Sequence, residues 1–140
     1  MNIQQNSQIM HKFETVINAA DEAAAEKLID SKASFITPAS PTPLYGAKGY
    51  LSLVHWLRKS FPDVQWHIQD MAAQDNKVAV LWECTGTHQG DFMGIPATNK
   101  TFKTTFMNFY YFNDEGKIIQ DLAGVGMIGI LQTLKTGNRM

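Results

Sequence analysis

Apolar residues in the first third of the chain recur at the spacing of amphipathic helices. Residues three and four apart lie on one helix face, so the recurrence predicts a helix over Ser7–Ala20. An alanine-rich segment with acidic residues in its first turn predicts a second helix over Asp21–Ile29. A third helix is expected to begin near Ala47 and to end before Pro62. The stripe that it should bury comprises Tyr50, Val54, Leu57 and Phe61.

From Val64 onward the pattern changes to an alternation of apolar and polar residues, which is typical of half-buried strands. The four predicted strands are Val64–Ala73, Lys77–Thr87, Thr101–Phe112 and Lys117–Ala123. Turn-forming residues at 75–76 and 113–116 connect neighbouring strands as hairpins, so the sheet is expected to be antiparallel. Helices followed by such a meander indicate an α+β fold.

Shorter segments complete the prediction. Ala33–Thr37 should be extended, and a last helix is predicted over Met127–Lys135. Residues 124–129 have the G-x-G-x-x-G spacing of a dinucleotide site, but only eleven residues follow and none is acidic. That site needs an acidic residue about twenty positions later and a returning parallel strand. We therefore reject the motif and expect no cofactor.

The strand Thr101–Phe112 carries apolar side chains on both of its faces. One face is expected to hold Phe102, Thr104, Phe106, Asn108, Tyr110 and Phe112, and the other Lys103, Thr105, Met107, Phe109 and Tyr111. A sheet with one solvated face should alternate apolar with polar residues, whereas this strand ends apolar on both. In so short a chain a second copy is the expected cover, so we predict a homodimer packed through the sheet.

Composition narrows the class of protein. The 140 residues suit a single domain over 1–140, and 44% hydrophobic with 18% charged residues is typical of globular domains. A net charge of −1 gives no reason to expect nucleic acid, and no apolar run is long enough to span a membrane. The polar first residues lack the layout of a secretion signal, so a cytoplasmic location is expected. The four histidines lack the spacing of metal ligands, and Cys84 is a single cysteine, so we expect neither a metal site nor a disulfide.

Residues 85–100 read T-G-T-H-Q-G-D-F-M-G-I-P-A-T-N-K, a long loop with three glycines and a proline. Trp56, Arg58 and the F-P-D of 61–63 precede it, and G-K-I-I…G-I-L-Q-T-L follows it. This order resembles the SnoaL-like polyketide and ester cyclases of the nuclear transport factor 2-like superfamily, over nearly the whole chain. The resemblance implies a cone-shaped, curved antiparallel sheet wrapped around the N-terminal helices, with an apolar cavity inside.

The resemblance also implies an acid/base pair that this chain lacks. In SnoaL-like cyclases an aspartate on the last strand removes a proton from a carbon next to a carbonyl, and a histidine on the preceding strand assists it. Those positions fall at Ala123 and Asn108 here. Asp121 lies two residues before Ala123 and therefore on the same face, where a carboxylate in an apolar cavity could act as the base. The alternative is a solvated or ion-paired residue at the rim of the sheet.

We take Asp121 and His88 as the candidate catalytic residues, although His88 could instead stabilise its loop by bonding a backbone carbonyl. The candidate ligand contacts are Asn108, Tyr110, Phe106, Trp56, Trp82, Phe92 and Met93. For the two tryptophans a place in the core is the commoner role. The ligand implied by the resemblance is a small apolar compound with a carbonyl group.

Two functions remain open. The first is a cofactor-free cyclase or isomerase in which Asp121 is the base and Asn108, Tyr110 and His88 hold the developing oxyanion. The second is a binding protein that keeps the cavity but has lost the chemistry of the family. Epoxide hydrolysis, found elsewhere in the superfamily, needs an arginine between two aspartates. The arginines here are Arg58 on a helix and Arg139 in the tail, which disfavours it.

Overall fold

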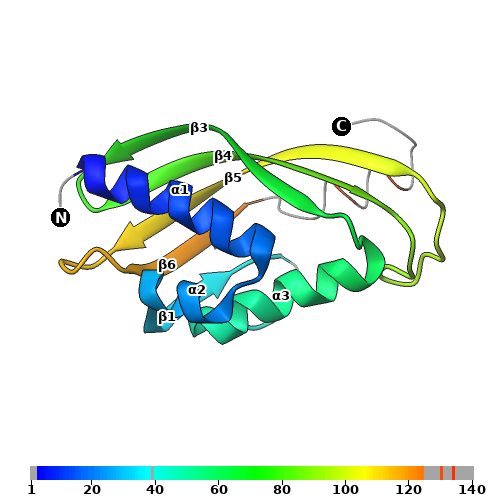
Figure 1. Ribbon diagram of the computed structural model, residues 1–140, viewed down its shortest axis with the longest axis horizontal. Coiled ribbons are helices and arrows are strands. Elements are labelled where there is room, and N and C mark those ends of the chain that lie inside the picture. The colour runs from blue at the N-terminus through cyan, green and yellow to red at the C-terminus, as the bar shows by residue number, and fades with distance from the viewer. Residues whose placement is uncertain (1–2, 39, 125–129, 131–133, 135–140) are drawn as a thin grey trace.

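The computed structural model describes residues 3–38, 40–124, 130 and 134. The helices are α1 (Ile3–Ala19), α2 (Glu22–Leu28) and α3 (Gly46–Ser60). The strands are β1 (Ile29–Ile36), β2 (Leu44–Tyr45), β3 (Gln65–Gln74), β4 (Lys77–Thr87), β5 (Thr101–Phe112) and β6 (Ile118–Ala123). They form a six-stranded sheet in the order β2-β1-β6-β5-β4-β3. Figure 1 shows the three helices together on one side of the long, curved strands β3, β4 and β5.

The sheet is mixed, which corrects the expectation of a wholly antiparallel sheet. The pairs β3–β4, β4–β5 and β5–β6 are antiparallel, as the hairpin turns predicted. β1 runs parallel to β6, and the short β2 pairs antiparallel with β1 at the edge. A parallel pair needs a long crossover, and here the connection contains α3 and the whole β3–β5 meander. β1 also begins directly after α2, so it is longer than the extended segment predicted at Ala33–Thr37.

The predicted helices are present with shifted ends. α1 begins before Ser7, and Asp21 lies outside α2 as its N-cap, where its carboxylate accepts a hydrogen bond from the Ala24 amide (3.1 Å). Such a cap satisfies one of the free amides at a helix start. The predicted last helix, Met127–Lys135, lies outside the described residues apart from Ile130 and Leu134, which are helical and buried.

The two faces of β5 separate as its alternation predicted. Even-numbered residues of β5 face the helices and are buried, except for the half-buried Phe106. On the other face Lys103, Thr105, Met107 and Phe109 are exposed, and Tyr111 is half-buried. The inner face packs on α1, where the ring of Phe13 lies 5.5 Å from that of Tyr110 and 6.4 Å from that of Trp82.

Irregularities in the pairing accompany the curvature of the sheet. The register shifts between Ile68 and Asp70 in β3, and again between Tyr111 and Phe112 in β5. Bulges of this kind bend a strand and increase its twist. At Gly86 a Cβ atom would lie 2.7 Å from the Phe102 ring, so only glycine lets that ring lie across β4. The resulting concave face leaves a space between the sheet and α3.

Candidate functional site

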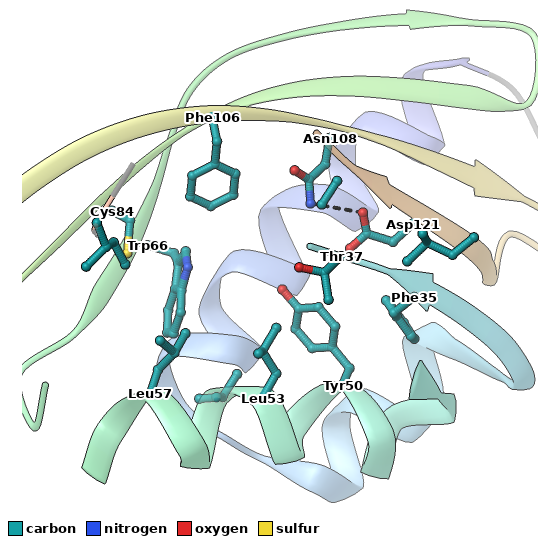
Figure 2. A pocket seen from close by; sticks show the side chains of 14 residues that line it. Phe35, Thr37, Tyr50, Leu53, Leu57, Trp66, Cys84, Phe106, Asn108 and Asp121 are labelled. Carbon is teal, nitrogen blue, oxygen red and sulfur yellow. Dashed lines mark hydrogen bonds between the residues drawn. The ribbon is translucent and has the colours of Figure 1, made fainter. Parts of the chain in front are cut away.

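A cavity of about 50 Å³ lies between α3 and the concave face of the sheet. Its lining is mostly apolar, with side chains from β1, α3, β3, β4, β5 and β6. The oxygen-bearing side chains gather at one end, as Figure 2 shows. They are Thr37, Tyr50, Asn108 and Asp121. An apolar cavity with a few convergent polar groups is the usual form of a small-molecule site.

Asn108 of β5 and Asp121 of β6 face each other across the two paired strands. The Asn108 Nδ2 group donates a hydrogen bond to Asp121 Oδ1 at 2.9 Å, drawn dashed in Figure 2. Asp121 is 3% exposed and Asn108 is 6% exposed. Asp121 and Ala123 both line the cavity, as strand alternation predicted. The alternative of a solvated carboxylate at the rim of the sheet is therefore wrong.

A second layer of hydrogen bonds lies behind Asn108. The Trp82 Nε1–H group donates to the Tyr110 hydroxyl oxygen at 2.9 Å, and Asn108 Nδ2 lies 3.3 Å from the same oxygen. Tyr110 and Trp82 are almost wholly buried and are not among the lining residues. They were expected to contact the ligand, but the structure places them in the wall that supports Asn108.

The electrostatics of Asp121 are those of an isolated buried carboxyl group. No lysine, arginine or histidine occurs among the described lining residues. Burial raises the pKa of Asp121 well above its ordinary value, and the hydrogen bond from Asn108 lowers it only in part. Desolvation disfavours the charged form of a carboxyl group, and a pKa raised towards neutrality suits a group that must both take up and release a proton.

Tyr50 of α3 supplies a hydroxyl group to the same end of the cavity (Figure 2). Its ring is held by Phe35 and Phe13, with centroids at 4.7 and 5.2 Å. Burial raises the pKa of Tyr50, as do the charges of Asp121 and then Cys84, so the hydroxyl stays protonated. The sequence predicted that Tyr50 is buried, but periodicity alone did not show that its hydroxyl lies at the same end of the cavity as Asp121.

Phe106 and Asn108 line the cavity, as expected from their shared strand face. Residues that sequence reasoning did not select also line it, and they include Phe35, Thr37, Tyr50, Leu53 and Trp66. They come from α3, from β3, and from β1 and the residue that follows it, and only the folded chain brings these segments around one cavity. The available signal was an apolar stripe on a helix or strand, and such a stripe is equally typical of an ordinary core.

His88 lies in the loop after β4 and does not line the cavity. Its Nδ1 atom accepts a hydrogen bond from the Thr98 amide (3.2 Å) and lies 2.9 Å from the Thr98 hydroxyl. Its ring packs on Phe61 at 5.5 Å. Because Nδ1 accepts, the proton of the neutral ring is on Nε2. His88 therefore stabilises its loop, through a hydroxyl and an amide rather than the backbone carbonyl that we expected, and the structure does not bring it to Asp121.

The three remaining residues that we expected to contact the ligand lie in the β4–β5 loop or against it. Trp56 packs on Phe92 at 5.4 Å, and Phe92 packs on Phe61 at 4.9 Å. Met93 lies at the exposed tip of the loop, with a φ of 48° and 56% of its side chain exposed. None of Trp56, Phe92 and Met93 lines the cavity. Trp56 and Phe92 pack the loop against the end of α3, whereas Met93 is exposed to solvent.

Two further features are absent from the part of the chain that the structure describes. No group of three or more histidine, cysteine, aspartate or glutamate side chains there could hold a metal ion. None of the helices there is both long enough and apolar enough to cross a membrane.

The chain is similar to one protein family in sequence and to several solved structures in fold. The family model described as SnoaL-like polyketide cyclase matches residues 7–134. A candidate polyketide cyclase from Acidithiobacillus ferrooxidans has a TM-score of 0.80 at 27% identity, over 97% of this chain and 99% of that chain. IdmH from Streptomyces antibioticus, also a candidate polyketide cyclase, has a TM-score of 0.77 at 25% identity, over 94% and 99%. A SnoaL-like polyketide cyclase from Agrobacterium tumefaciens, at 16% identity and a TM-score of 0.76 over 96% and 99%, shows the fold alone. No curated protein matches the chain.

Proposed function

Since the chain belongs to the SnoaL-like polyketide cyclase family, we propose that its cavity catalyses proton transfer at a carbon next to a carbonyl group, without a cofactor. The ligand is a small, apolar carbonyl compound, and the product is a cyclised or isomerised form of it. One observation carries this proposal. Asp121 places a carboxyl group inside an apolar cavity, held by a neutral amide and with no cation among the described lining residues.

The residues around Asp121 suggest a division of roles. The ionised carboxylate of Asp121 removes a proton from the carbon, and the electron pair of the C–H bond moves into the carbonyl to form an enolate. The Tyr50 hydroxyl donates a hydrogen bond to the oxygen on which negative charge develops. In an isomerisation the protonated Asp121 returns the proton at another carbon. In a cyclisation the enolate carbon bonds to the carbon of a second carbonyl group in the ligand, the C=O π electrons move to that oxygen, and Asp121 protonates it. Both routes balance without an external acid, metal or cofactor.

The test is solvent hydrogen exchange into simple ketones, because the natural ligand is unidentified. Cyclohexanone, 1-indanone and 2-tetralone are incubated with the protein in D₂O, and loss of the α-proton signal is followed by NMR. Asp121→Asn should lower the protein-dependent rate by about 10²- to 10⁴-fold, the range for losing a general base. Tyr50→Phe should lower it by about 10²-fold, the lower end for losing one donor to an oxyanion.

Two exposed positions supply matched controls. Asp114→Asn in the β5–β6 turn and Tyr45→Phe in β2 make the same chemical changes on the surface and should leave the exchange rate unchanged. An exchange rate that survives Asp121→Asn would remove the base from the proposal.

The alternative is a small-molecule binder that has lost the chemistry. The observation that favours it is the pair Ala123 and Asn108, which line the cavity at the positions where the resemblance to the family implies the catalytic aspartate and the histidine that assists it. Trp66 lines the same cavity, so its fluorescence reports binding. Ketone-dependent quenching of Trp66 without any exchange above the buffer rate would establish the binder and exclude the enzyme.

We also propose that two copies of the chain associate through the outer face of the sheet. Met107 and Phe109 of β5 are 67% and 49% exposed at the centre of that face. Their cross-strand partners, Leu81 and Ala79 on β4 and Leu122 on β6, are apolar and half-buried. Together these residues form one apolar patch across the middle of the sheet, and the same patch on a second copy could pack against it in a two-fold dimer.

A further inference from the structure

The cavity is smaller than a ligand that contains a ring. Its volume is about 50 Å³, whereas an apolar cavity that holds a benzene molecule measures about 150 Å³. Protein interiors are close-packed, so the missing space has to come from the movement of a side chain in the lining. The side chain that moves then decides which ligands are admitted.

Most of the large lining side chains are held in place by neighbours. The rings of Phe35 and Tyr50 pack on each other with centroids 4.7 Å apart. Asn108 and Asp121 are joined by their hydrogen bond. Trp66 is 7% exposed, and one side chain of α1 bonds both its backbone amide and its carbonyl at 2.8 Å. Moving any of these residues would break a contact that the folded protein makes.

Phe106 differs from them in its surroundings. It is the one half-buried residue among those of β5 that face the helices. On the same face of β5, Phe102 packs on the Phe61 ring at 5.0 Å, and Tyr110 packs on the Phe13 ring at 5.5 Å. No ring of the described residues packs on Phe106 in this way. Its side chain is therefore the aromatic one that moves at the lowest cost.

The Phe106 ring lies in the space that a ligand would use. Figure 2 shows it directed from β5 into the cavity, where Asn108 and Asp121 form the polar end. A change of rotamer carries the ring towards the solvent that already reaches it. The space that it leaves has the size and flatness of a six-membered ring. The movement therefore exchanges a ring of the protein for a ring of the ligand.

We propose that Phe106 is the specificity-determining residue of the cavity, because its ring holds the place of a ligand ring and turns out when the ligand binds. Phe106 and Asn108 are two residues apart on one face of β5, which separates them by about 7 Å along the strand. A ketone of two fused rings reaches from the polar end into the place of Phe106, whereas a ketone of one ring reaches only one of the two. The ligand is therefore a fused-ring ketone with its carbonyl group at Asp121.

This inference rests on the proposed function and deepens it, because it names the class of ketone that the same cavity takes. Turning the ring out lowers the apparent affinity for every ligand, since only the molecules with an open cavity can bind. A ligand that fills the vacated space regains affinity by burying its own apolar surface there. A smaller ligand leaves that space unfilled, so the ring discriminates against it.

The test compares Phe106→Ala with wild type. Dissociation constants for 2-tetralone and cyclohexanone are measured by the quenching of Trp66 fluorescence. Phe106→Ala should bind 2-tetralone about 10-fold more tightly, because no ring has to be displaced, and should change the constant for cyclohexanone by less than about threefold. Tyr45→Ala removes an exposed ring from β2, outside the cavity, and should leave both constants unchanged.

Phe106→Leu keeps an apolar side chain in the strand, so it guards against a variant that fails to fold, and it should change the constants in the same order by less. A constant for 2-tetralone that is equal in wild type and both variants would overturn the proposal. An equal gain for the two ketones, or no binding of 2-tetralone by any of the three proteins, would also overturn it.

The outcome is separable from that of the proposed function, because binding and hydrogen exchange are measured independently. A dependence of ketone affinity on Phe106 in a protein without exchange activity supports the role of Phe106 in a binding protein and removes the base. Exchange with affinities that do not respond to Phe106→Ala keeps the base and removes the role of Phe106.

Discussion

Asp121, Tyr50 and Cys84 all direct ionisable groups at one cavity, and burial raises the pKa of each. At the scale of single residues, desolvation rather than ion pairing therefore determines the pKa values of these three groups. The thiol of Cys84 stays protonated and is a poor nucleophile, because the thiolate is the reactive form. Asp121 is the one of the three whose raised pKa brings its titration nearer to neutral pH.

Replacing Asp121 should change how stability depends on pH. The pKa of Asp121 is higher in the folded protein than in the unfolded chain, so folding favours the protonated carboxyl. The contribution of Asp121 to stability is therefore fully present below the unfolded pKa and is lost as the pH rises through the folded pKa. Each unit of pKa difference corresponds to about 1.4 kcal/mol of that fall. Asp121→Asn cannot ionise, so its free energy of unfolding should decline less with pH.

Urea denaturation from acid to mildly alkaline pH measures this difference. Asp114→Asn, in an exposed turn, is the matched control and should follow the wild-type slope. Equal slopes for wild type and Asp121→Asn would show that the carboxyl is not desolvated in the folded protein.

At the scale of elements, the end of α3 fastens the loop that joins β4 to β5. The Ser60 carbonyl accepts hydrogen bonds from the amides of Gln89 (2.9 Å) and Gly90 (3.1 Å). A Cβ atom at Gly90 would lie 2.4 Å from the Lys59 carbonyl oxygen, so only glycine allows this approach. The Asp63 carboxylate accepts from both the amide and the hydroxyl of Thr87 at 2.7 Å.

Asp63→Asn should destabilise the protein at neutral pH by about 1 kcal/mol, a value reduced for the exposure of the site. Partial burial raises the pKa of Asp63, but the hydrogen bonds from Thr87 outweigh it and leave the pKa lowered. This contribution is present above the unfolded pKa and is lost as the pH falls through the folded pKa. Thermal unfolding should therefore separate variant and wild type at neutral pH, and the two should converge in acid.

Asp91→Asn is the control for Asp63→Asn, because Asp91 is exposed in the β4–β5 loop that α3 fastens, and its backbone carbonyl, not its carboxylate, accepts from Ser60. A difference between Asp63→Asn and wild type that persists in acid would mean that the carboxylate charge is not what holds Thr87.

At the scale of the whole molecule, one face of the curved sheet lines the cavity, and the opposite face exposes Met107 and Phe109, where we propose that the dimer forms. Met107→Lys should weaken the proposed dimer, because it places a charge at the centre of its apolar surface. Sedimentation should show wild type at twice 15.7 kDa and the variant moving towards 15.7 kDa. Met93→Lys changes another exposed methionine, at the loop tip, and should remain dimeric. A monomeric wild type at micromolar concentration would end the proposal.

The amino-acid sequence by itself determined the elements and the faces of the strands. Apolar spacing, prolines and glycines act over a few residues, so they located α3, the β3–β6 meander and the inward face of β5. Alternation also placed Asp121 on the face of Ala123, and that shared face was enough to make it a candidate base. These inferences succeeded because each depends only on local backbone geometry.

Only the tertiary structure decided which of these residues meet. Asn108 reaches Asp121 because β5 and β6 pair in one register, and Tyr50 joins them because α3 packs across the sheet. The sequence also made His88 and Phe92 candidates for the site, but in the structure their rings pack against Phe61 instead. The parallel pairing of β1 with β6 has no local signature at all. Such contacts join segments far apart in sequence, so they depend on how the whole chain packs rather than on any short pattern within it.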